Sequence, residues 1–189
     1  MTKKEIRKIY REKRMNLNDA QVEKMQDLLL IQLQKLALPY VQCVHTYLAK
    51  AETREPDTSS IIRWLQFRNP GLKIVVPKID GRTGQLLPIL FSEEETLVKN
   101  DFGVREPEGG ELVPVEWIDL VLVPLLAFDE TGQRIGYGMG FYDKFLSTCR
   151  EDAILLGLSY FDPVESINDT HGFDVPLTAC VTPYRIYEF

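Results

Sequence analysis

Two near-continuous apolar runs constrain the fold of this 189-residue chain more than any other feature of its sequence. The first, IDLVLVPLLAFD, spans residues 118–129, and the second, AILLGLSYF, spans residues 153–161. Runs without alternating polar residues are typical of strands that are buried on both faces of a parallel sheet. A glycine-rich segment and an expected helix over about residues 141–150 separate the two runs. Strand, turn, helix and strand in this order predict a βαβ unit.

The rest of the chain continues the alternation of helix and strand. The further expected elements are helices over about residues 3–15, from the capping residue Asn18 to a stop at Pro39 and over 57–69, strands over 41–49 and 72–79, and a loop over 106–117. Apolar residues make up 44% of the chain, which suffices for a core. We therefore expect one domain over residues 1–189, with a three-layer α/β/α architecture around a mostly parallel sheet.

Positive charge is concentrated at the N-terminus. The net charge of the whole chain is −6 and that of residues 1–14 is +5, so the remaining residues carry −11. One interpretation is a solvated helix face, which charge alone favours. The other is that these cations meet an anionic ligand such as phosphate. Nucleic acid is not an expected partner, because the acidic body would repel it and no aromatic residues alternate with the cations to stack bases.

Several other classes of protein are disfavoured by composition. No run of eighteen apolar residues occurs, and the charged N-terminal stretch does not resemble a signal peptide, so we expect a cytoplasmic protein without membrane contact. The three cysteines are far apart and form no C-x-x-C pair, which argues against a disulfide framework and a zinc site. We expect them to be buried thiols. Two histidines are too few for a histidine-based metal cluster.

The segment RIGYGMGFYDKFL, residues 134–146, follows the first apolar run and carries glycine at every second position, 136, 138 and 140. An extended backbone would present the three glycines on one face and bring main-chain N–H groups close to a ligand. The following helix start favours phosphate, Arg134 could add a charged contact, and Asp143 is well placed to hold Mg²⁺. The segment matches neither the Walker A loop nor the dinucleotide fingerprint. A plain glycine-rich turn with Asp143 as a helix-start acid is an open alternative.

The stretch LVLVPLLAFDETGQRIGYGMGFYDKFL closely resembles the signature of the 5-formyltetrahydrofolate cyclo-ligase family. The resemblance extends to KKEIRKIYREKR, YLAKAETREPDT, FGVREP and HGFDVPLTACVTP, and so to nearly the whole chain. It implies an ATP- and Mg²⁺-dependent ligase of one-carbon metabolism that converts 5-formyltetrahydrofolate to 5,10-methenyltetrahydrofolate, ADP and phosphate. It also implies a fold shared in outline with sugar-phosphate isomerases and coenzyme A transferases. We expect a monomer.

The resemblance also assigns residues to roles. It implies that ATP is bound by Lys3, Lys4, Arg7, Arg134, Gly136, Tyr137, Gly138, Met139, Gly140, Phe141 and Tyr142. It implies that the folate faces Leu48, Glu55, Phe102, Tyr137, Gly138, Met139, Gly140 and Phe141. Asp143 and Asp174 are the implied Mg²⁺ ligands, and Arg134 and Asp143 the implied catalytic residues. The formyl oxygen would attack the γ-phosphate without a covalent enzyme intermediate.

Four of these assignments have a plain structural alternative. Leu48 and Phe102 could belong to the core, Glu55 could be an acid at a helix start, and Asp174 could be a turn residue. The chain also departs from the family pattern, since Phe141, Leu125 and Thr178 stand where tyrosine, glycine and aspartate are usual. The rival functions are an ATP-dependent enzyme of the same fold with another substrate, a sugar-phosphate isomerase and an RNA-binding module.

Overall fold

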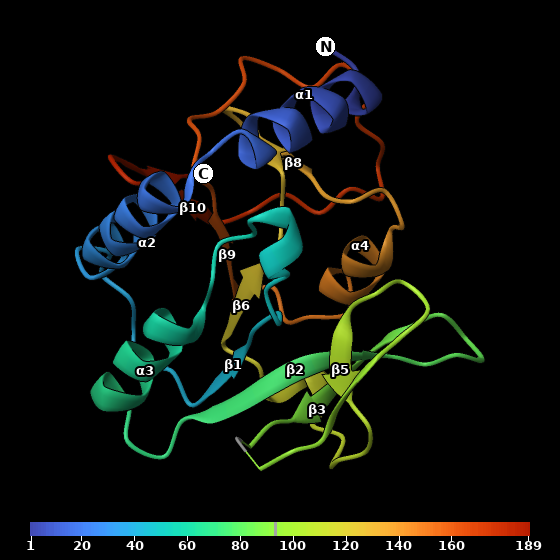
Figure 1. Cartoon of the computed structure of the whole chain (residues 1–189). Helices are drawn as coiled ribbons and strands as arrows, with labels where there is room; N and C mark the ends of the chain where they lie inside the picture. The colour runs from blue at the N-terminus through green and yellow to red at the C-terminus, as the bar shows by residue number, and fades with distance from the viewer. Residues whose placement is uncertain (93) are drawn as a thin grey trace.

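A seven-stranded sheet forms the centre of the computed structural model, which describes residues 1–92 and 94–189 (Figure 1). Its strands are ordered β11-β10-β9-β6-β1-β2-β3. The helices are α1 (Lys3–Met15), α2 (Asp19–Leu33), α3 (Ser59–Arg68) and α4 (Phe141–Leu146), with two 3₁₀ turns, η1 (Ala51–Thr53) and η2 (Val115–Trp117). The strands are β1 (Cys43–His45), β2 (Lys73–Ile79), β3 (Leu86–Leu90), β4 (Leu97–Lys99), β5 (Arg105–Pro107), β6 (Leu120–Val123), β7 (Ala127–Phe128), β8 (Arg134–Ile135), β9 (Ile154–Leu158), β10 (Ala179–Val181) and β11 (Ile186–Glu188).

The five inner strands, β10, β9, β6, β1 and β2, are parallel, and the edge strands β11 and β3 are antiparallel to their neighbours. β4 pairs with β5 and β7 with β8 in two separate antiparallel ribbons. The mixed α/β class with a mostly parallel sheet is therefore confirmed.

The side chains of the inner strands alternate between two cores, because successive residues of a strand point to opposite faces. Leu120 and Leu122 of β6 face the core that α2 and α3 cover. Val121 and Val123 face the opposite core, which α4 and irregular segments cover. In Figure 1, α2 and α3 lie on one side of the sheet and α4 on the other. Since both faces are covered, the inner strands are apolar throughout.

Helix α1 covers neither face of the sheet. Its buried Ile6 and Tyr10 pack with Ala127 of β7 and Ile135 of β8 in a third, smaller cluster. Figure 1 shows α1 lying across one end of the molecule, beside β8. The strongly basic helix is thereby fixed beside the segment that follows β6.

The predicted elements are mostly present, with changes in length. Helix α1 has the expected bounds, and α2 has its capping box of Asn18 and Gln21. The strand expected over 41–49 has only three residues, and the run 118–129 divides into β6 and β7, since the intervening Pro124 has no N–H to donate. The expected loop 106–117 holds the end of β5 and the turn η2. Cys43 and Cys180 are buried as expected, whereas Cys149 is only half-buried. No helix in the described ranges has both the length and the apolar content that a membrane span requires.

Candidate functional site

The candidate site lies where the strand order of the sheet reverses. β1 and β6 are parallel neighbours, but the chain leaves β1 toward β2 on one side and β6 toward β9 on the other. In open α/β sheets, ligands bind beyond the carboxyl ends of two such strands. The Tyr137 hydroxyl, from the segment after β6, donates a hydrogen bond to the Glu55 carboxylate, from the segment after β1. This contact joins two of the predicted site residues across the reversal point.

Arginine side chains lie close to two of the three glycines. A Cβ on Gly136 would lie 3.3 Å from Arg134 Nη1, and one on Gly138 would lie 3.4 Å from Arg7 Cζ. Arg7 Nε in turn donates to the carbonyl of Gly136 over 3.0 Å. The prediction of one extended glycine face is wrong, because Gly138 and Gly140 are left-handed, with φ of 98° and 72°. Left-handed glycines turn the chain into α4 at a conformation that side chains rarely adopt.

Arg134 and Asp143, the two predicted catalytic residues, form an ion pair. Arg134 Nη2 lies 2.7 Å from Asp143 Oδ1, and the arginine side chain is only 4% exposed. Burial lowers the pKa of Arg134 from its ordinary value, and the charge of Asp143 opposes this shift. The Nε of Arg134 is buried without a hydrogen-bond partner among the described residues. The guanidinium therefore has an unused donor at the base of the glycine segment.

The two predicted metal ligands lie close together. The backbone N–H of Val175, which follows Asp174, donates to Asp143 Oδ1 over 3.4 Å. Asp174 Oδ2 forms an ion pair with Lys3 at 2.5 Å and accepts the N–H of His171 at 2.6 Å. Burial raises the pKa of Asp174, but these hydrogen bonds and the charge of Lys3 outweigh it and leave the pKa below its ordinary value. Asp174 is thus also a turn residue, which is the structural alternative given for it in the sequence analysis.

This pair of carboxylates fits Mg²⁺. Asp143 Oδ2 and Asp174 Oδ1 accept no hydrogen bond from the described residues, so each carboxylate keeps one free oxygen. Mg²⁺ in nucleotide sites is ordinarily held by one or two carboxylates, with water and substrate phosphates completing its shell. No group of three or more His, Cys, Asp or Glu residues with metal-site geometry occurs in the described part of the chain. Two carboxylates with one free oxygen each are therefore a donor set that this metal accepts.

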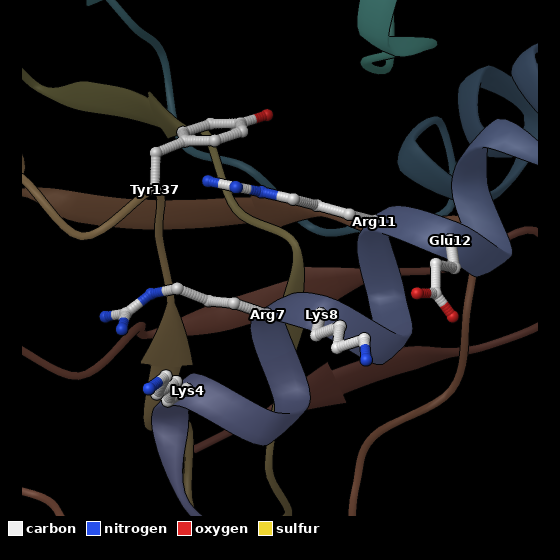
Figure 2. Close-up of a pocket in the computed structure, with 6 residues that line it drawn as sticks. All are labelled: Lys4, Arg7, Lys8, Arg11, Glu12 and Tyr137. Atoms are coloured by element: carbon white, nitrogen blue, oxygen red, sulfur yellow. The ribbon is translucent and has the colours of Figure 1, made fainter.

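A cavity of about 440 Å³ lies between α1 and the glycine segment, and we call it the α1 pocket. It is lined by Lys4, Arg7, Lys8, Arg11, Glu12 and Tyr137. Figure 2 shows Arg7 and Arg11 extending from α1 toward the segment that carries Tyr137. The four cations face a single acid, and none forms an ion pair with a described residue. Such a surface suits a polyanion.

Three of the predicted folate residues, Glu55, Phe102 and Phe141, are connected to one another. Phe102, which is 45% exposed, packs edge-on against Phe141, with ring centroids 5.2 Å apart. Lys50 joins this pair to Glu55, because its N–H donates to Glu55 Oε2 over 3.0 Å and its Nζ donates to the Phe102 carbonyl over 3.0 Å. Phe102 is therefore not a core residue, and Glu55 lies four residues before α3 rather than at its start.

The remaining predicted residues have fewer contacts. Lys3 pairs with Asp174 and does not line the α1 pocket. Gly138, Met139 and Gly140 are exposed, and Leu48 is half-buried. Tyr142 lies in α4 with its hydroxyl buried and unpartnered by any described residue.

The sequence analysis overlooked Arg14 and Lys50. Arg14 is 3% exposed and donates to the Tyr137 hydroxyl over 2.8 Å. A signal existed, because Arg14 follows Ile6 and Tyr10 at intervals of four residues and therefore shares the buried face of α1. Lys50 acts mainly through its backbone, for which the sequence holds no signal.

The comparisons with known proteins agree on one family. A sequence model described as the 5-formyltetrahydrofolate cyclo-ligase family matches residues 1–183. The 5-formyltetrahydrofolate cyclo-ligase of Escherichia coli K12 is 30% identical over 139 residues, which cover 71% of this chain and 75% of that protein. The enzyme of the same name from Haemophilus influenzae is 32% identical over 129 residues, covering 65% and 67%.

Two solved structures share the fold. A 5,10-methenyltetrahydrofolate synthetase from Mycoplasma pneumoniae superposes with a TM-score of 0.76 at 20% identity, covering 97% of this chain and 99% of that one. The synthetase of the same name from Aquifex aeolicus also gives a TM-score of 0.76, at 24% identity, covering 100% and 93%. At identities of 20% and 24%, these two comparisons show a shared fold and not a shared function.

Proposed function

The chain belongs to the 5-formyltetrahydrofolate cyclo-ligase family and is an enzyme, and we propose that it converts 5-formyltetrahydrofolate to 5,10-methenyltetrahydrofolate with ATP and Mg²⁺, releasing ADP and phosphate. The observation that carries this proposal is the arrangement around Tyr137. A cationic pocket lies on one side of this residue, and an acid with an aromatic pair lies on the other. A reaction that transfers a phosphoryl group from ATP to a folate needs a surface for each substrate, and the two surfaces must be adjacent.

The α1 pocket is the proposed place of the ATP phosphates. Its cations would neutralise their charge, and the guanidinium of Arg134 would add positive charge beside the glycine segment. Asp143 and Asp174 would hold Mg²⁺, which supplies charge neutralisation at the phosphate oxygens when bound. Lys3 and Arg134 keep these two carboxylates in position through their ion pairs.

The proposed folate surface is formed by Glu55, Phe102 and Phe141. The partly exposed rings of Phe102 and Phe141 suit contact with a flat heterocycle, and the Glu55 carboxylate suits hydrogen-bond donors at the edge of that heterocycle. This surface would place the formyl oxygen against the γ-phosphorus. Orientation and charge stabilisation then account for catalysis, since the described site offers no side chain in the geometry of a general base next to a nucleophile.

The proposed reaction takes place in two steps. The formyl oxygen forms a bond to the γ-phosphorus, and the bond from that phosphorus to ADP breaks. The neighbouring folate nitrogen then bonds to the activated formyl carbon and loses its proton, while the carbon–oxygen bond breaks and phosphate leaves. No covalent bond to the enzyme is formed.

The test is to incubate the protein with ATP, Mg²⁺ and 5-formyltetrahydrofolate and to follow the methenyl product by its absorbance. We expect product only when all three are present. A protein that binds ATP but yields no product would overturn the folate half of the proposal and favour another substrate on the same fold. The cytoplasmic location and the monomeric state stay predictions.

A further inference from the structure

Arg14 differs from the other basic residues of α1 in its surroundings. It is 3% exposed, and it makes no ion pair with any residue in the described ranges. Its Nη2 donates to the Tyr137 hydroxyl over 2.8 Å, and its Nη1 donates to the Leu125 carbonyl over 3.3 Å. Burying a cation against neutral acceptors is costly, so a purely structural position would be better filled by an apolar side chain.

The direction of the hydrogen bonds follows from the chemistry of the three groups. A guanidinium can only donate, so the Tyr137 oxygen must accept from Arg14. The single phenolic proton is then left for the next group, the Glu55 Oε1 atom. Burial, and secondarily the charge of Glu55, raise the pKa of Tyr137, so the hydroxyl keeps this proton. Arg14 thus fixes which way the hydroxyl of Tyr137 points.

Glu55 receives one donor on each carboxylate oxygen. Tyr137 donates to Oε1, and the N–H of Lys50 donates to Oε2. These two donors fix the orientation of the Glu55 carboxylate. Lys50 also donates from its Nζ to the carbonyl of Phe102, so it fixes Glu55 relative to Phe102.

We propose that Arg14 is a positioning residue that acts through the Tyr137 hydroxyl to orient Glu55 on the folate surface. The proposal rests on the proposed function, because it takes Glu55 as a folate contact. Arg14 itself lies outside the lining of the α1 pocket, so its role differs from that of the exposed cations of the same helix. Tyr137 serves both surfaces, since its ring lines the α1 pocket and its hydroxyl holds Glu55.

The test compares R14M, Y137F and the double variant. Each single change removes the same hydrogen-bonded path, so each should raise the KM for 5-formyltetrahydrofolate about ten-fold and leave the KM for ATP within about two-fold. Because the two residues act in one path, the double variant should also show about ten-fold, rather than the hundred-fold that independent effects would multiply to. R14K keeps the charge and one donor and should restore part of the loss.

The control is K13M, which removes an exposed cation from the same helix outside the α1 pocket and should change neither KM. Thermal unfolding of every variant separates an effect on positioning from a loss of structure. If R14M does not fold, Y137F still tests the proposal, because it removes the hydroxyl and keeps the ring. Multiplicative effects, or an unchanged folate KM in Y137F, would overturn the proposal. Absence of product from the wild-type protein would instead overturn the proposed function, so the two failures are distinguishable.

Discussion

At the scale of single residues, the glycine segment is explained by its neighbours. Gly136 and Gly138 lie against the side chains of Arg134 and Arg7, and Gly138 and Gly140 have a left-handed φ. The sequence predicted close approach to a ligand, whereas the structure shows close approach to the arginines of the site itself. Spacing alone could not distinguish the two, because Arg7 is distant in sequence and its position depends on how α1 packs.

The first residue-scale prediction concerns Asp143. Changing it to asparagine retains an oxygen that can accept from the buried Arg134 and removes the carboxylate proposed to hold Mg²⁺. We expect kcat to fall at least about 100-fold and the Mg²⁺ concentration for half-maximal rate to rise. The measurement is the rate over a Mg²⁺ titration, with D152N, an exposed carboxylate beside Arg150, as the control. A wild-type Mg²⁺ dependence in D143N would remove Asp143 from the metal site.

The second residue-scale prediction concerns His45 at the end of β1. Its ring is fully buried against Tyr142 and Phe145, and neither ring nitrogen has a partner among the described residues. Burial lowers the pKa of His45 to about 3. Because the unfolded histidine titrates near 6.5, the unfolded chain binds one more proton between these values, and stability falls as the pH falls.

Replacing His45 by leucine should therefore flatten the acid side of the stability profile. Between pH 6.5 and 5, we expect the wild type to lose about 1.6 kcal/mol more of its unfolding free energy than H45L does. Urea unfolding at several pH values measures this, and H171Q at an exposed histidine should follow the wild type. Parallel profiles for wild type and H45L would show that His45 does not titrate with unfolding.

At the scale of elements, the sequence was most informative where burial is strongest. The apolar runs predicted β6 and β9, and the capping residue Asn18 predicted the start of α2. The edge strands β3 and β11 and the inner strand β10 were not predicted. β3 contains Pro88, which pairs with Pro77, and proline normally argues against a strand. Their existence depends on the pairing partner rather than on local sequence.

The element-scale prediction concerns the exposed cations of α1. The variant changes Lys4, Lys8 and Arg11, three cations of the α1 pocket. Lys3 is left out because it pairs with Asp174, and Arg7 because it donates to the carbonyl of Gly136. Changing all three to glutamine should raise the KM for ATP about ten-fold, with little effect on melting temperature because the residues are exposed. A charge-matched control changes Lys24, Lys35 and Arg63, exposed cations on or next to α2 and α3. Equal effects in the two triple variants would restore the interpretation of α1 as a solvated face.

At the scale of the whole molecule, the reversal of strand order between β1 and β6 explains why the site is where it is. The sequence predicted a site after the strand that became β6, but not that Glu55, Phe102 and Asp174 would converge on it. These residues come from segments after β1, between β4 and β5, and before β10. Only the family resemblance named them, since convergence of distant loops is set by the order of strands, which local patterns do not encode.

The central claim is that ATP and the folate bind on adjacent surfaces beside Tyr137 and react with each other there. The stoichiometry of the reaction tests this claim most directly. Methenyl product and released phosphate should be measured in the same reaction, with 5-formyltetrahydrofolate limiting and ATP and Mg²⁺ in excess. The account predicts one phosphate for each methenyl product, and no phosphate release once the folate is consumed. Product formed without phosphate release, or phosphate released without product, would contradict it.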